Sequence, residues 1–237
     1  MKLIIFALLN LMLPVLPLAA AEVRGSVSFD YQGLFGNAGT TQTNRISVAL
    51  LPAEGQHTVP RSKRRQRIEI VNNRMTPAFL TVQKGDSIEF VNRDNVYHEL
   101  FSLSPGEPVK ARLGKAGDHD QDKTEFSFKQ AGTTHFFCRI HNKSYARIDV
   151  VETPYLQMVE PGGRFHFVGL APGLWRLRLA APAAETKWLD VAAMTTPPPL
   201  SLTLVSHGGG QAGPQGLDAG ADIGQLYRRY GDPGQHQ

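Results

Sequence analysis

Apolar and polar residues alternate in many short stretches of this chain. In residues 23–29, for example, Val23, Val27 and Phe29 are apolar and the even positions between them are polar. A period of two places successive side chains on opposite faces of a β-strand, whereas a helix has a period near 3.6. No stretch has a helical period long enough for a core helix. The pattern predicts strands at residues 23–29, 46–51, 67–71, 79–82, 87–91, 125–128, 134–138, 146–151, 163–167, 173–179, 187–191 and 200–204, and a turn at 92–95 that leads into residues 98–101.

Turn-forming residues separate these stretches. The chain holds 23 Gly and 16 Pro, and residues 31–44 and 52–60 are predicted loops. Residues 104–123 contain few apolar and many charged residues, which predicts a long exposed connection. Residues 207–237 are rich in Gly, Pro, Gln and Asp and are predicted to form a flexible tail. Many short strands between turns are typical of β-sandwiches, so we predict an all-β protein.

The N-terminal residues have the layout of a secretory signal peptide. Lys2 is followed by an apolar stretch over residues 3–18 and by small residues at Ala19, Ala20 and Ala21. The other interpretation is an uncleaved membrane anchor, for which the apolar stretch is short. We therefore predict that residues 1–21 are a signal peptide and that the mature protein lies in a bacterial periplasm. No later stretch is long and apolar enough to cross a membrane.

The charge of the chain is too small to indicate a nucleic-acid partner. The formal net charge is +4 and falls to +3 once Lys2 is removed. One local stretch is strongly basic. It could bind an acidic partner or a membrane surface, or it could be a solvated loop or an edge strand protected by charge. Its members are Arg61, Lys63, Arg64, Arg65 and Arg67.

The single cysteine, Cys138, points to metal chemistry. An exported protein with one cysteine has no intramolecular disulfide, and its thiol must be buried, paired between chains or bound to a metal. Cys138 is followed three residues later by His141, so one tight loop can carry both, and His98 lies forty residues earlier on a separate turn. A thiolate with two imidazoles suits copper in an electron-transfer site. The candidate metal ligands are therefore His98, Cys138 and His141, for one copper ion.

The residues that lead to these ligands resemble the cupredoxin family, the group of plastocyanin and amicyanin. The resemblance covers about residues 67–152. It implies a Greek-key β-sandwich in which His98 is the first histidine ligand, Cys138 the thiolate and His141 the second histidine, with Asp94 and Asn95 in the turn before the first ligand. The matching positions before His98 are Pro77, Leu80, Val82, Gly85, Asp86, Ile88, Phe90, Asn92 and Asp94.

A narrower resemblance is to the periplasmic cupredoxin-like proteins called methylamine-utilisation proteins. It includes the segment from Val150 to Tyr155. In that group a sandwich of the carboxypeptidase-regulatory type lies beside the cupredoxin, and residues 162–177 fit such a module. Between the predicted signal peptide at 1–21 and the predicted tail at 207–237, the resemblance implies a cupredoxin domain at 61–152 and a discontinuous second sandwich from 22–60 with 153–206.

Ser144 departs from the pattern of the family. Amicyanin-like loops have a methionine three residues after the second histidine, where this chain has Ser144. Copper could bind with three strong ligands alone, a water or a backbone carbonyl such as that of Tyr97 could be the axial ligand, or the site could bind no metal in the cell. Because the axial ligand mainly tunes the potential, we expect binding, with a lower potential than a methionine would give.

Two other histidines are weaker candidates for ligands. His135 lies an odd number of positions before Cys138 and should face the opposite side of its strand. His119 lies in the charged segment 118–122, which is a solvated loop or a second cation site.

Three functions fit the sequence to different degrees. The first is a one-electron carrier whose redox partner is a protein of the cell envelope, with Phe101 or Tyr145 in a docking patch. The second is a non-redox scaffold that stores copper or holds no metal. The third, a copper enzyme, lacks further ligand clusters, and no nucleophile–base pattern, phosphate-binding loop or pair of carboxylates is present, so we predict that the protein is not an enzyme.

Overall fold

The computed structural model describes residues 20–32, 45–53, 58, 61–103, 108–119, 121–182 and 184–207. These residues form sixteen β-strands and no helix, as an all-β protein requires. Accordingly, this part of the chain contains no helix of the length and hydrophobicity that a membrane span needs. Nearly all of the predicted signal peptide and of the predicted tail lies outside the described residues.

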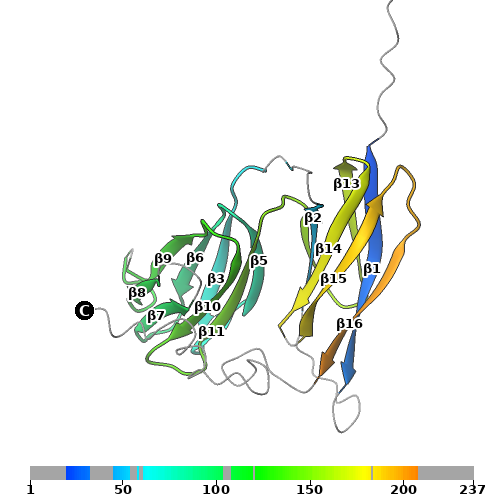
Figure 1. Ribbon diagram of the computed structural model, residues 1–237. Coiled ribbons are helices and arrows are strands. Elements are labelled where there is room, and N and C mark those ends of the chain that lie inside the picture. Colours follow the sequence, from blue (N-terminus) through cyan, green and yellow to red (C-terminus); the bar gives the residue numbers. More distant parts are fainter. Residues whose placement is uncertain are drawn as a thin grey trace, which may run out of the picture.

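Nine strands form a sandwich around one apolar core, drawn in cyan and green in Figure 1. Its smaller sheet has the order β4-β3-β6-β9 and its larger sheet the order β5-β11-β10-β7-β8. Alternate residues of both sheets point inward, so that Ile70, Phe90, Phe136 and Ile148 are fully buried between them. The strands are β3 (Arg65–Val71), β4 (Arg74–Thr76), β5 (Phe79–Gln83), β6 (Ser87–Asn92), β7 (His98–Leu103), β8 (Lys110–Leu113), β9 (Lys123–Ser127), β10 (Gly132–Cys138) and β11 (Tyr145–Val151).

Seven further strands form two sheets around a second core. Their orders are β13-β1-β16 and β12-β2-β14-β15, and both sheets combine strands that precede residue 53 with strands that follow residue 155. The identity of this second sandwich with a carboxypeptidase-regulatory module, and the domain boundaries, stay predictions. The strands are β1 (Ala21–Gln32), β2 (Ile46–Pro52), β12 (Leu156–Val159), β13 (Gly163–Leu170), β14 (Gly173–Ala181), β15 (Ala184–Ala193) and β16 (Leu200–His207).

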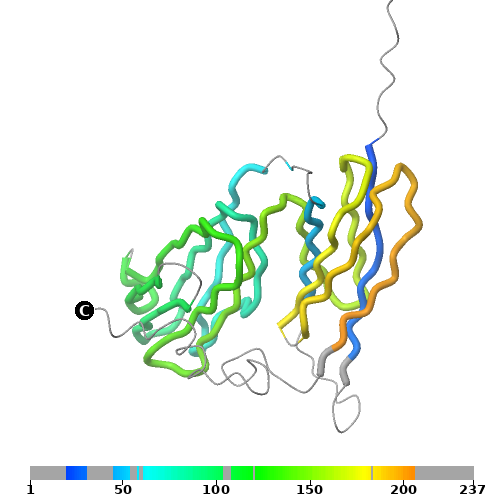
Figure 2. Tube along the Cα trace, in the orientation of Figure 1, coloured from blue at the N-terminus to red at the C-terminus, as the bar shows by residue number. Residues whose placement is uncertain are grey.

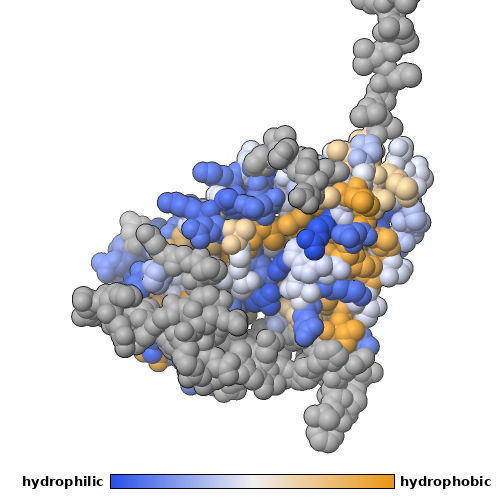
Figure 3. Space-filling view, viewed as in Figure 1, coloured by the Kyte–Doolittle hydropathy of each residue, from blue (hydrophilic) through white to orange (hydrophobic). Residues whose placement is uncertain are grey.

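The two sandwiches are in contact through a polar ion pair. The chain returns from β11 to β12 through a short linker (Figure 2). The outer faces of β11 and β14 meet at Asp149 and Arg178, where Arg178 Nη2 lies 2.5 Å from Asp149 Oδ2. Asp149 is 1% exposed and Arg178 is 8% exposed. In the space-filling view, hydrophilic residues cover most of the visible described surface of the first sandwich, and hydrophobic residues gather over the second (Figure 3).

The prediction of a long exposed connection at residues 104–123 is wrong in part. Residues 110–113 form β8, which pairs with β7, and Leu113 is completely buried. The sequence pattern did not indicate this strand, because the neighbours of Leu113 are charged and an edge strand needs only one side chain in the core. The short strands β4 and β12 were also not predicted.

The basic stretch at residues 61–67 serves mainly to hold the first sandwich together. β4 pairs only with residues 69–71 of β3, so residues 65–67 pair with β6 alone and lie at the edge of the sheet, as one of the predicted alternatives has it. Arg61 binds both carboxylate oxygens of the buried Asp86, at 3.0 and 2.5 Å. Arg65 and Arg67 both pair with the buried Glu89. Burial alone would raise the pKa of Glu89, but the hydrogen bonds and charges of both arginines outweigh burial, so that the pKa lies below its usual value.

Candidate metal centre

The three candidate ligands come together at one end of the first sandwich. His98 begins β7 and Cys138 ends β10, and these neighbouring strands pair so that Cys138 lies opposite Leu100. Strand pairing thus closes the gap of forty residues between them. His141 lies in the loop that follows β10. Two backbone hydrogen bonds close this loop, from Ser144 N–H to the His141 carbonyl (3.1 Å) and from Cys138 N–H to the Ser144 carbonyl (3.2 Å).

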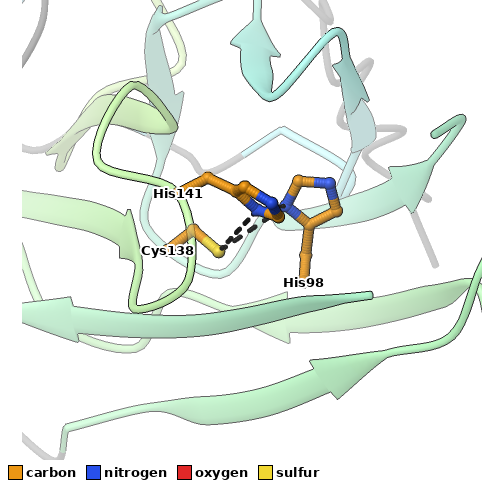
Figure 4. Close-up of side chains that lie close together, drawn as sticks. All are labelled: His98, Cys138 and His141. Atoms are coloured by element: carbon orange, nitrogen blue, oxygen red, sulfur yellow. Dashed lines mark hydrogen bonds between the residues drawn. The ribbon is translucent and has the colours of Figure 1, made fainter. Parts of the chain in front are cut away.

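The three side chains point at one another (Figure 4). Cys138 Sγ lies 3.5 Å from His98 Nδ1 and 3.7 Å from His141 Nδ1, and the two Nδ1 atoms are 3.2 Å apart. The circle through these atoms has a radius of about 2.0 Å, close to the metal–nitrogen and metal–sulfur distances of about 2.0 and 2.3 Å in zinc sites. A small metal ion at its centre would be within bonding distance of all three atoms.

Asp94 determines which nitrogen of His98 faces this centre. His98 is fully buried, which lowers the pKa of its imidazole; Asp94 opposes that shift and His141 adds to it. Burial by itself raises the pKa of Asp94. The amides of Asn73 and Asn72 and the His98 ring outweigh burial, so that the pKa of this carboxyl lies below its usual value. The ionised carboxylate accepts the His98 Nε2–H at 3.1 Å. This leaves the Nδ1 lone pair of a neutral imidazole directed at the centre.

The donor set fits a copper ion. Two imidazole nitrogens and one sulfur in a trigonal arrangement form the set that electron-transfer copper sites use. His98 is 0% and Cys138 5% exposed, whereas His141 is partly exposed, so His141 is the most accessible of the three ligands. Within the described ranges, no other group of His, Cys, Asp or Glu side chains meets the spacing that a metal ion needs.

Ser144 does not direct its hydroxyl proton to this centre. The side chain is buried, and its Oγ–H donates to the backbone carbonyl of Asn73 at 2.7 Å. Tyr97, whose backbone carbonyl is a candidate axial ligand, is 41% exposed, and its ring lies beside two cations. The guanidinium of Arg112 and the ammonium of Lys115 lie 5.0 and 5.5 Å from the centre of that ring.

The remaining candidates lie apart from the centre. His135 faces the opposite side of β10 from Cys138 and its Nδ1 lies 3.0 Å from the Tyr145 hydroxyl. His119 is exposed in its loop. The carboxylates beside it, Asp118 and Asp122, accept hydrogen bonds from the loop's own amides, those of Lys115 and Gly117.

The predicted docking residues are wrong, and the sequence analysis missed the role of Asp94. Phe101 and Tyr145 are 4% and 6% exposed and pack with Leu103 and Phe137 in a small apolar cluster. The large exposed hydrophobic residues next to the ligands are Val96, Tyr97 and Ile140. The spacing of four residues between Asp94 and His98 was the available signal for an orienting carboxylate, but a spacing alone does not show which atoms meet.

Comparisons with known proteins give the following similarities. No family model and no curated protein matches the chain. A Cu(I) structure of an amicyanin mutant is 21% identical and covers 36% of this chain and 81% of its own, with a TM-score of 0.32. A purple cupredoxin from Nitrosopumilus maritimus is 19% identical over 36% of this chain and 99% of its own, with a TM-score of 0.31.

A copper-containing nitrite reductase from Thermus scotoductus is 22% identical over 42% of this chain and 25% of its own, with a TM-score of 0.33. At these scores the similarity concerns part of the fold. The case for a metal centre rests on the three converging side chains of this chain.

Proposed function

We propose that this protein binds one copper ion through His98, Cys138 and His141 and carries single electrons in the periplasm. The observation that supports it is the trigonal set of two Nδ1 atoms and one Sγ atom around a point about 2.0 Å from each. Bound copper would supply a one-electron couple between Cu(I) and Cu(II). A soft sulfur and two nitrogens are acceptable to both oxidation states.

The frame around the ligands supports electron transfer rather than catalysis. His98 and Cys138 are held by neighbouring strands, and His141 by a loop that its own backbone hydrogen bonds close. Ligands that do not rearrange lower the cost of a change in charge at the centre. The described residues next to the centre offer no second metal group on which a substrate could react.

The partner in this proposal is an acidic redox protein that docks over His141. His141 is the partly exposed ligand, and Ile140 beside it is 54% exposed. Arg112 and Lys115 lie over the exposed ring of Tyr97, one residue before His98. An apolar centre with cations at its rim fits a partner with an apolar contact surrounded by carboxylates.

The experiment is to titrate the metal-free protein with Cu(II) and record its visible absorption spectrum. We expect one equivalent of copper and an intense thiolate-to-copper charge-transfer band that ascorbate bleaches. The band should disappear in Cys138→Ser and persist in His119→Ala, which removes an exposed histidine of the charged loop.

If no stoichiometric copper binds, the second function, a non-redox scaffold, replaces this one. Copper that binds without a reversible redox change would indicate storage. A band that survives Cys138→Ser would contradict the ligand assignment.

A further inference from the structure

The side chain of Ser144 connects the loop that carries Cys138 and His141 with the turn that binds Asp94. Its main chain closes the loop between Cys138 and His141, through the two backbone hydrogen bonds described above. Its hydroxyl reaches out of that loop to the carbonyl of Asn73, 71 residues earlier in the chain, at 2.7 Å. A buried hydroxyl with so short a hydrogen bond is committed to that partner.

Asn73 belongs to the tight turn between β3 and β4. Asn72 and Asn73 have positive φ angles of 52° and 59°, and Val71 pairs with Arg74, which defines a two-residue hairpin turn with both central residues left-handed. Asparagine is one of the few residues that adopts this conformation readily. The turn directs both central amides to one side.

Both of these amides bind the carboxylate of Asp94. Asn72 N–H donates to Oδ1 at 2.6 Å and Asn73 N–H donates to Oδ2 at 2.9 Å. Oδ2 in turn accepts the Nε2–H of His98. The connection therefore runs from the His141 loop through Ser144, the turn and Asp94 to His98.

We propose that Ser144 is a positioning residue that fastens the two histidine ligands at one spacing, and that it is not an axial ligand. The hydroxyl holds the Cys138–His141 loop against the turn, and the turn holds the carboxylate that orients His98. The three outcomes that the sequence left open at this position, which are three strong ligands alone, a water or backbone carbonyl as axial ligand, and no metal, do not depend on a serine oxygen. Its effect on copper rests on the proposed function, but its effect on the metal-free fold does not.

The effect of Ser144→Ala on the metal-free protein separates a positioning role from ligation. The variant removes the hydroxyl and leaves the Asn73 carbonyl without this donor, beside an Asn73 side-chain oxygen that is already buried with no partner among the described residues. We expect the Tm of the metal-free protein to fall by about 3–6 °C. We expect the Kd for Cu(II), measured by chelator competition, to rise about tenfold. Ser144→Thr keeps a hydroxyl and should recover both values.

A double-mutant comparison keeps the proposal testable if the threonine methyl does not fit. Ser144→Ala and Asp94→Ala each break the same connection, so their Tm shifts in the metal-free protein should not add. Additive shifts would overturn the proposal. So would a Ser144→Ala variant with an unchanged metal-free Tm and an altered copper spectrum, since that is the result expected of a ligand. If no variant binds copper, the proposed function fails, and the metal-free Tm values still decide the role of Ser144.

Discussion

Two buried polar clusters of the first sandwich differ in how their polar groups are satisfied. On the outer face of β11, Asp149 lies between two guanidinium groups, with Arg147 at 2.9 Å and Arg178 at 2.5 Å, and also accepts the hydroxyl of Thr133 at 3.0 Å. At the end of β7 and β10, two imidazole nitrogens and a sulfur converge with no fixed positive charge between them.

This difference indicates that the Asp149 cluster is structural and that the cluster of His98, Cys138 and His141 is suited to a ligand. A carboxylate between two cations has its charge compensated by the fold itself, and Arg178 brings the second sandwich into that compensation. Lone pairs that face one another gain from a cation at their centre. The comparison can be tested by removing one member of each cluster.

The largest expected effect is that of Asp149→Ala on folding. Removing the carboxylate leaves Arg178 buried without its partner, so the free energy of unfolding of the metal-free protein should fall by about 3–5 kcal/mol in urea denaturation. His141→Ala in the metal-free protein should change it by less than about 1 kcal/mol, because its ring supports a ligand set rather than the core.

The matched control is Asp190→Ala, which removes an exposed carboxylate 3.8 Å from Arg176 and should change stability by less than about 0.5 kcal/mol. A larger loss in His141→Ala than in Asp149→Ala would break the comparison.

The next effect concerns the carboxylate that serves the metal centre. In Asp94→Asn the charge is lost, and the amide group cannot accept hydrogen bonds from two backbone amides and His98 together. We expect the Kd for Cu(II) to rise by about 10–100-fold, measured by chelator competition. Glu69→Gln, which alters a surface carboxylate paired with Arg93, should leave the affinity unchanged. Equal affinities in the wild type and Asp94→Asn would contradict the orienting role.

Acid should weaken the Asp149 cluster. Burial raises the pKa of Asp149, but the charges of Arg147 and Arg178 lower it further, so its folded pKa lies below the ordinary value of about 3.9. A lowered folded pKa contributes stability above about pH 4, and that stability is lost as the pH falls through the folded value. Asp149→Asn should therefore lose less stability than the wild type below pH 4 in urea titrations. Part of the loss should remain, because the pKa values of Glu89 and Asp94 are also lowered. Identical acid limbs would contradict the assignment.

The smallest effect concerns cations that are free to meet a partner, in contrast to Arg178. Lys115→Glu at the Tyr97 rim should slow the oxidation of the copper-loaded protein by hexacyanoferrate(III), an anion, severalfold at low ionic strength, and the effect should shrink with salt. Lys129→Glu is the matched control. Lys129 is exposed and follows β9, whose last residue, Ser127, pairs with the first residue of β6, so it lies at the other end of that strand from Asn92. Equal slowing in both variants would show that only net charge matters.

Much of the architecture could be predicted from local pattern. Alternation along single strands is a property of neighbouring residues, so twelve predicted strands correspond to strands of the structure. β8 escaped prediction because only Leu113 of its four residues is fully buried. The basic residues Arg61, Arg65 and Arg67 were read as a docking surface or a solvated edge, because their acidic partners, Asp86 and Glu89, lie on segments more than twenty residues away.

What the sequence determined by itself about the centre is its chemistry. The residue types at His98, Cys138 and His141, and the spacing of three within the loop, depend on the chain alone. Only the tertiary structure decided which atoms meet: that both histidines present Nδ1, that Asp94 accepts from Nε2 of His98, and that the Ser144 hydroxyl donates to the Asn73 carbonyl. The contact between Asp94 and His98 spans four positions, but the others join residues 40 to 71 positions apart, and only the pairing and packing of β3, β7 and β10 bring those residues within hydrogen-bond distance.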